Sequence, residues 1–225
     1  AGLIRVREFA MKDAYSFDMN QDGLDLHYEM IKQAYKNIYF RCGLETIIVE
    51  ADSGAIGGKD SHEFILVDES GEDTIIVCEN CDYAANSEKA SFNKHIETTS
   101  PDLPTENVHT PNIVNIESLA DFLSMPKTKI LKTVVYSANN ELVIVTIRGD
   151  LEINEVKLAN LLKVKDLRLA NPEEVNSIRL VAGYASPIGI TNTKIVADDS
   201  VTQGSNLIAG SNRENYNVRN VNYPR

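Results

Sequence analysis

The stretch "KTVVYSANNELVIVTIRG", Lys132 to Gly149, is the most informative part of the chain for its architecture. Two runs rich in β-branched residues flank Asn139-Asn140, and asparagine tolerates the left-handed backbone that a tight hairpin turn requires. The stretch therefore predicts a β-hairpin.

The segments on either side of this hairpin indicate a mixed α/β region. Asn115 is placed to cap a short helix that carries Ile116, Leu119, Phe122 and Leu123. A second helix fits "NEVKLANLL" (154–162), and strands are predicted near "TKIVAD" (193–198) and "NLIAG" (206–210).

The first 90 residues have a different pattern. Six residues with a spacing of three or four predict a helix over about 22–42, and Gly43 can end it. Short runs in "ETIIVEAD", "HEFILVDES" and "EDTIIVCEN" predict an antiparallel sheet. Residues 89–107 are rich in Pro, Thr, Ser and Asn, as in a linker, so we expect two domains, 1–95 and 96–222.

Composition narrows the function classes. The 225 residues carry a formal net charge of −11, which argues against broad binding of a phosphate backbone, so any nucleic acid should be held over a small part only. No apolar run is long enough for a membrane span and no signal peptide opens the chain, so we expect no membrane partner and a cytoplasmic protein.

Cys42, Cys78 and Cys81 leave three interpretations open. The spacing in "CENC" suits zinc or a redox pair, but a four-thiolate site needs a second pair and a thioredoxin-like site needs a βα turn. Reduced structural thiols are the favoured interpretation. His27, His95 and His109 have no ligand-like spacing, so we expect no metal.

Several ordered segments carry a resemblance to a known family. "GLIRVREFAMKDAYSF" resembles part of motif 2 of class II synthetases, and "EADSGAIGGKDSHEF" and "CDYAANSEKA" are similar to segments of bacterial-type prolyl-tRNA synthetases. "TPNI", "KILKTVVY", "RGDLEINEVKL" and "GYASPIGI" resemble the editing domain inserted in these enzymes.

The resemblance implies an α+β chain: a partial class II antiparallel sheet with a helix, followed by a mixed α/β editing domain of the prolyl-tRNA synthetase insertion, or YbaK-like, type. The first half of motif 2, motif 3 and the anticodon-binding domain have no counterpart in the sequence. We therefore expect a fragment with half an activation site and a complete editing domain.

For the activation half, the resemblance places Arg5 at the ATP phosphates and Phe9 on adenine. It also implies that Gly57, Gly58, Ser61, His62 and Glu63 border the proline pocket of the parent enzyme. An exposed strand face is the alternative for Arg5 and Phe9, and we favour it for this chain alone.

For the editing half, the resemblance implies hydrolysis of alanine esters on tRNA(Pro), because a pocket sized for proline excludes the smaller alanine poorly. It assigns the catalytic role to Lys132 and to the loop that contains Gly183, Pro187 and Gly189. Such a loop can present backbone N–H groups to an oxyanion without a side-chain nucleophile. Without the resemblance, Lys132 reads as a surface lysine with a buried stem.

The resemblance also places Thr110, Ile116, Leu119 and Asp198 in the editing pocket. Ile116 and Leu119 could equally form an ordinary helix core face. Asn217 stands where many relatives carry histidine, and asparagine cannot titrate near neutral pH.

The expected partners are the tRNA(Pro) acceptor end and, as editing substrate, its alanine ester; the parent is expected to be a homodimer. Editing needs no cofactor, whereas the complete parent uses ATP and Mg. An alternative function is a module that binds the tRNA acceptor end with a degenerate, inactive pocket.

Overall fold

The structure is a computed structural model that describes residues 7–9, 11, 13–54, 58, 60–92 and 100–223. The chain divides into two compact units, Ala1–Ala90 and Ser91–Arg225, which are considered separately. The predicted domain boundary near residue 95 lies outside the described residues.

The first unit begins with α1 (Gln21–Arg41), close to the predicted helix. The side chain of Asn20 caps it by accepting a hydrogen bond from the Gly23 N–H at 2.9 Å. Gly43 follows the helix with φ +74°, a conformation that favours glycine, and donates its N–H to Phe40 O. The sequence-based prediction of this helix is confirmed.

A four-stranded sheet follows, in the order β2-β1-β4-β3. β1 pairs with β2, and β3 with β4, in antiparallel fashion, whereas β1 and β4 are parallel. The three predicted strands are present, but the short β4 was not predicted. The bounds are β1 (Thr46–Glu50), β2 (His62–Leu66), β3 (Ile75–Val77) and β4 (Ala84–Asn86).

Helix α1 packs on β2 through aromatic side chains. The rings of Tyr35 and Tyr39 lie 5.6 and 5.5 Å from that of Phe64, and the Tyr28 hydroxyl lies 2.8 Å from His62 Nδ1. No residue of α1 is buried, so the helix covers the sheet only partly.

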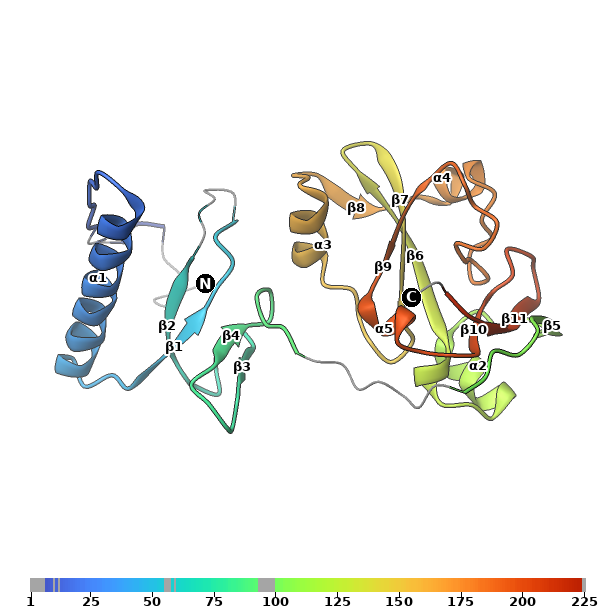
Figure 1. The fold of residues 1–225 in the computed structure, drawn as a ribbon, viewed down its shortest axis with the longest axis horizontal. Helices are drawn as coiled ribbons and strands as arrows, with labels where there is room; N and C mark the ends of the chain where they lie inside the picture. Colours follow the sequence, from blue (N-terminus) through green and yellow to red (C-terminus); the bar gives the residue numbers. More distant parts are fainter. Residues whose placement is uncertain are drawn as a thin grey trace. The chain divides into compact units, whose positions relative to one another are not determined.

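The predicted hairpin is the centre of the second unit (Figure 1). β6 (Leu131–Ala138) and β7 (Glu141–Arg148) pair over their full length. Asn139 and Asn140 have φ of +49° and +68°, as the tight turn requires. β8 (Leu167–Leu169) adds to β6 in antiparallel fashion and β9 (Lys194–Ala197) adds to β7 in parallel.

A second sheet has the order β10-β11-β5 and is antiparallel. A single bridge between Ile130 and Ile208 connects it to the start of β6. Its strands are β5 (Glu106–His109), β10 (Leu207–Gly210) and β11 (Tyr216–Val221).

Helices flank the hairpin. The Asn115 side chain caps α2 by accepting from the Ser118 N–H at 2.8 Å, as predicted. α4 was not predicted, although Asn171 and Glu174 form a capping box around Pro172. The bounds are α2 (Ile116–Leu123), the 3₁₀ turn η2 (Lys127–Lys129), α3 (Glu155–Leu162), α4 (Pro172–Ser177) and α5 (Asp199–Thr202).

The two faces of the hairpin pack against different helices. Tyr136, Val143 and Val145 pack with Leu158 of α3 on one face. Val135 and Ile144 pack with Leu180 and the α4 region on the other. β6 and β7 are therefore a central layer, which fixes the positions of residues at the start of β6. Within the described part of the chain, no helix is long and apolar enough to cross a membrane.

Candidate functional site

A pocket of about 300 Å³ lies between α2 and the start of β6. The loop that follows α4 and the second sheet complete its lining. Five residues from the sequence-based site prediction line it: Ile116, Leu119, Lys132, Gly183 and Asn217. The other lining residues are Ile113, Val114, Asn115, Leu131, Thr133, Ala185 and Gly210. We call this the Gly183 pocket.

The apolar wall of the Gly183 pocket is part of the core. Leu119 is only 5% exposed and packs with Ile130 and Ile208, and Ile116 packs against the same cluster. The structure shows that these two residues are part of the core and also line a cavity, so their core role does not conflict with the predicted role in a pocket. A wall anchored in this way keeps the width of the pocket fixed.

The loop of residues 183–190 approaches the rest of the unit closely at two glycines. A Cβ on Gly183, where φ is +82°, would lie 2.8 Å from Val114. A Cβ on Gly210 would lie 2.1 Å from Tyr184 O. Only glycine fits at these two positions without movement of the backbone, and both line the pocket.

Asn212 holds this loop in place. Its Oδ1 accepts from the Ser186 N–H at 2.8 Å, and its Nδ2 donates to Ser186 O and Ile188 O at 3.0 and 3.1 Å. Its own N–H donates to Tyr184 O. Sequence reasoning missed Asn212 as well as Gly210 and Thr133. The available signal was the run "GSNREN", in which Asn212 and Asn215 adopt positive φ.

Thr110 and Asn217 form a buried pair. The Thr110 hydroxyl donates to Asn217 Oδ1 at 2.7 Å, and Asn217 Nδ2 donates to Ala209 O at 3.2 Å. Thr110 does not itself line the pocket, but this hydrogen bond attaches it to a residue that does. Both polar atoms of the Asn217 amide thus hold strands together.

The Lys132 ammonium points away from the Gly183 pocket. Side chains alternate along β6, and Val134, on the same face as Lys132, packs against the α3 cluster. Lys132 Nζ donates to Leu151 O at 2.9 Å and to Glu152 Oε1 at 2.6 Å. The side chain of Glu152 is 89% exposed, so this ion pair is easily exchanged for another partner.

A neighbouring ion pair adds further charge next to Lys132. Arg148 donates to both carboxylate oxygens of Asp150, at 2.6 and 2.9 Å. This hydrogen bonding lowers the pKa of Asp150. The Asp150 carboxylate therefore favours its ionised form beside Arg148.

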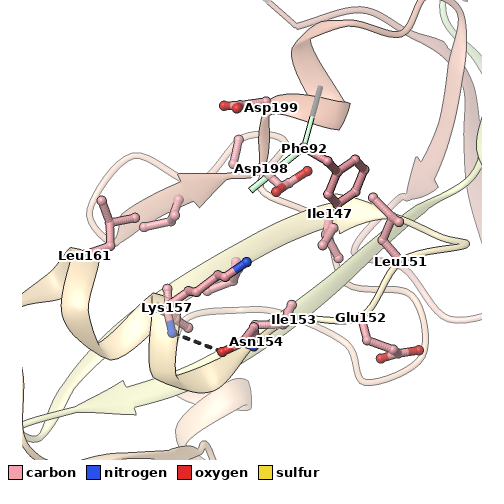
Figure 2. Close-up of a pocket in the computed structure, with 14 residues that line it drawn as sticks. Phe92, Ile147, Leu151, Glu152, Ile153, Asn154, Lys157, Leu161, Asp198 and Asp199 are labelled. Carbon is pink, nitrogen blue, oxygen red and sulfur yellow. Dashed lines mark hydrogen bonds between the residues drawn. The ribbon is translucent and has the colours of Figure 1, made fainter. Parts of the chain in front are cut away.

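The remaining predicted editing residues lie outside the pocket lining. Pro187 and Gly189 belong to the same loop, and a Cβ on Gly189 would meet no atom within 4 Å, although its φ is +77°. Asp198 is the N-cap of α5 and accepts from the Ser200 N–H at 3.0 Å. It lines a different pocket (Figure 2).

That second pocket, also about 300 Å³, lies between α3 and the edge of β7 and β9. Figure 2 shows the capping residue Asn154 with Lys157 and Leu161 of α3 on one side of it, and Asp198 and Asp199 on another. The Lys157 N–H donates to Asn154 Oδ1 at 3.1 Å as part of the helix cap. The pocket is a mainly apolar gap beside a capped helix.

In the first unit, the structure describes only some of the predicted activation residues. A pocket of about 490 Å³ between α1 and β2 is lined by His62 but not by Gly58, Ser61 or Glu63. Arg5 and Gly57 lie outside the described residues, and Phe9 is 67% exposed. The ATP and proline assignments in this unit therefore stay predictions.

No group of three or more His, Cys, Asp or Glu residues that could hold a metal ion occurs among the residues that the structure describes. Cys42 and Cys81 are exposed, Cys78 is half-buried, and all three are free thiols.

Two known protein families match the chain, and their matches overlap over residues 110–149. Residues 110–223 match the family described as "Aminoacyl-tRNA editing domain", and residues 1–149 match "tRNA synthetase class II core domain (G, H, P, S and T)". The first of these matches contains the whole Gly183 pocket.

Curated relatives match the entire chain. A "Proline--tRNA ligase" of Dehalococcoides mccartyi is 54% identical over 224 residues, and one of Halothermothrix orenii is 48% identical over 226 residues. These matches cover 100% of this chain but 39% and 40% of the relatives, so the chain spans about two fifths of their length.

Among solved structures, "Crystal structure of a putative trans-editing enzyme for prolyl tRNA synthetase" is 19% identical with a TM-score of 0.46, covering 51% of this chain and 74% of that one. With 44–55% identity to the curated ligases and matches to both domain families, the chain belongs to the prolyl-tRNA synthetase family of class II synthetases and joins part of a class II core to an aminoacyl-tRNA editing domain.

Proposed function

We propose that the Gly183 pocket hydrolyses the ester of alanine mischarged onto tRNA(Pro). One observation carries the proposal: an apolar wall, formed by Ile116 and Leu119, and the loop that contains Gly183 line the same pocket. This pocket lies in the part of the chain that matches the editing-domain family. The relatives are named for the ligation of proline to tRNA, so the tRNA acceptor end is the corresponding partner.

The proposed mechanism is hydrolysis by a positioned water. The wall accepts the methyl side chain of alanine, and the proline ring is excluded by size. Backbone N–H groups of the 183–190 loop stabilise the oxyanion, because donors that are already fixed need no reorganisation during the reaction. The Asn212 side chain supports this rigidity, because it accepts one hydrogen bond from the loop and donates two to it.

Asn217 has a positioning role in this proposal, and Lys132 has a catalytic, electrostatic one. Asn217 cannot act as a base, and its two hydrogen bonds hold β11 to Thr110 and to β10. Lys132 neutralises phosphate or carbonyl charge near the ester after its ammonium leaves Glu152. The exchange gives up an ion pair with an exposed carboxylate, and exposed pairs contribute at most about 1 kcal/mol. It also gives up the hydrogen bond from Lys132 Nζ to Leu151 O.

For the whole enzyme, we propose proline activation with ATP and Mg, charging of tRNA(Pro), a homodimer and a cytoplasmic location. The relatives' name and the class II core match support the ligase part of this proposal. We further propose that editing itself needs no cofactor. The proline pocket would include Gly57, Gly58, Ser61, His62 and Glu63, with Arg5 and Phe9 at ATP.

A second function is binding of the tRNA acceptor end without hydrolysis. The occupied hydrogen bonds of Asn217 and the outward direction of the Lys132 ammonium favour it. Single-turnover deacylation separates the two functions. Loss of labelled alanine from alanyl-tRNA(Pro), with prolyl-tRNA(Pro) left intact and cysteinyl-tRNA(Pro) tested alongside, supports the hydrolase. Saturable binding of alanyl-tRNA with the ester retained supports the binding module.

A further inference from the structure

The "CENC" motif lies in the turn between β3 and β4 of the first unit, remote in sequence from the Gly183 pocket. The turn is closed by a hydrogen bond from the Cys78 N–H to Tyr83 O at 2.8 Å. Cys78 and Cys81 are thus held on one short, ordered turn.

The sulfur of Cys78 accepts hydrogen bonds within this turn. The Asn80 N–H donates to Cys78 Sγ at 3.4 Å, and the thiol and the N–H of Cys81 also interact with this sulfur. These interactions lower the pKa of the Cys78 thiol, the Asn80 N–H having the largest effect. They favour the thiolate, which is the form that attacks disulfides.

Both sulfurs are available to reagents, since Cys81 is exposed and Cys78 is half-buried. A metal is the competing occupant, but a closed zinc site needs four ligands. Among the described residues, the two cysteines are not part of any group of three or more metal-binding side chains.

We propose that Cys78 and Cys81 are a thiol–disulfide exchange site, with Cys78 as the attacking thiol, Cys81 as the resolving thiol and low-molecular-weight disulfides as the oxidant. The proposal is independent of the deacylase function. It changes the interpretation of these residues from inert thiols to a reversible cross-link of the β3–β4 turn.

The reaction balances in two exchanges. The Cys78 thiolate attacks one sulfur of the reagent disulfide, forms a mixed disulfide and releases the first thiolate, which takes up a proton. Cys81 loses its proton to water and attacks the Cys78 sulfur, so that the Cys78–Cys81 bond forms and the second thiolate leaves and is protonated. The two cysteines lose two electrons, and the reagent is reduced to two thiols.

The test incubates the reduced chain with oxidised glutathione and follows intact mass and peptide maps. The wild type should lose two hydrogen atoms in mass, with the new bond mapped to Cys78 and Cys81. The C81S variant should instead retain one glutathione on Cys78, at a rate several-fold higher than that of the exposed Cys42. C42S is the matched control and should behave like the wild type.

C78S completes the set, because Cys81 should then react no faster than Cys42. The proposal is overturned if Cys78 in C81S reacts no faster than Cys42, or if the wild type forms no internal disulfide. It is also overturned if one Zn²⁺ per chain binds tightly and protects both cysteines from alkylation, since that result would identify a metal site.

Discussion

The two units of the chain bury very different side chains. In the described part of the first unit, the buried apolar residues are Val49 and four alanines, whereas the second unit buries Ile130, Ile144, Leu180 and Ile208 among many others. Because burial of a large aliphatic side chain stabilises a fold by about 1.5–3 kcal/mol, the second unit has much the stronger core. The difference teaches that the Gly183 pocket lies in the unit with the larger buried aliphatic core.

The largest predicted effect tests this difference in cores. Ile144→Ala removes three carbons from the centre of the sheet and should destabilise the second unit by about 2–5 kcal/mol. Val49→Ala removes two carbons from a core of alanines and should have a smaller effect, restricted to the first unit. Urea unfolding with hydrogen exchange read separately in β1 and in β6–β7 measures both.

In the wild type, β1 and β2 should exchange faster than β6 and β7, because β2 is an edge strand and both strands lie on a shallow core, which opens more easily. Slower exchange in residues 46–66 than in residues 131–148 would contradict the comparison.

A second prediction concerns close packing around the pocket. Gly183→Ala and Gly189→Ala both place a side chain at positive φ, which costs about 1–2 kcal/mol. Only the first also places Cβ 2.8 Å from Val114. We expect Gly183→Ala to slow deacylation on the order of 100-fold through displacement of the loop, and Gly189→Ala to slow it far less. Equal rates in the two variants, with circular dichroism unchanged, would show that the approach to Val114 is irrelevant to activity.

A third prediction concerns the Lys132–Glu152 ion pair. Glu152→Gln should change the free energy of unfolding by less than about 1 kcal/mol and should leave deacylation unchanged or faster, since the ammonium is released. Lys132→Ala should cost more activity than Lys132→Arg, which keeps the charge. If Glu152→Gln lowered the deacylation rate as much as Lys132→Ala, activity would depend on the intact Lys132–Glu152 ion pair and not on a released ammonium.

The smallest effect is a pH dependence at the start of α4. Arg168 and the Asn171 N–H bond to Glu174 and lower the pKa of its carboxyl to about 2. The ordinary value is about 4.3, so the carboxylate stabilises the fold above that pH, and this contribution is lost as the pH falls toward 2. Thermal melts at several pH values should show that the melting temperature falls less at acid pH in Glu174→Gln than in the wild type or in the control Glu173→Gln. If the melting temperature fell equally at acid pH in all three proteins, the ionised Glu174 would not stabilise the fold.

Local signals predicted much of this fold from the sequence. Asn20, Asn115 and Asn154 cap helices that the periodicity located, and Asn139-Asn140 turns the central hairpin. These features depend on residues within one or two turns of each other, which a sequence displays directly.

Long-range pairings could not be predicted in this way. The parallel pairing of β1 with β4 and the hydrogen bond between Thr110 and Asn217, 107 residues apart, depend on tertiary packing. The role of Asn212 in holding the 183–190 loop depends on a hydrogen bond to Ser186, 26 residues away, so only the tertiary structure shows it. Asp198 was assigned to the pocket from resemblance, but its hydrogen bond to the Ser200 N–H accounts for it as a helix cap.

The central claim is that the wall formed by Ile116 and Leu119 selects the ester by size. Single-turnover deacylation of alanyl- and prolyl-tRNA(Pro) by the wild type and by Leu119→Ala tests it most directly, with folding checked by circular dichroism. The account predicts that the wild type cuts only the alanyl ester and that Leu119→Ala also cuts the prolyl ester, because the enlarged pocket admits the ring. A folded Leu119→Ala variant that kept the wild-type rate and the full preference for alanine would contradict it.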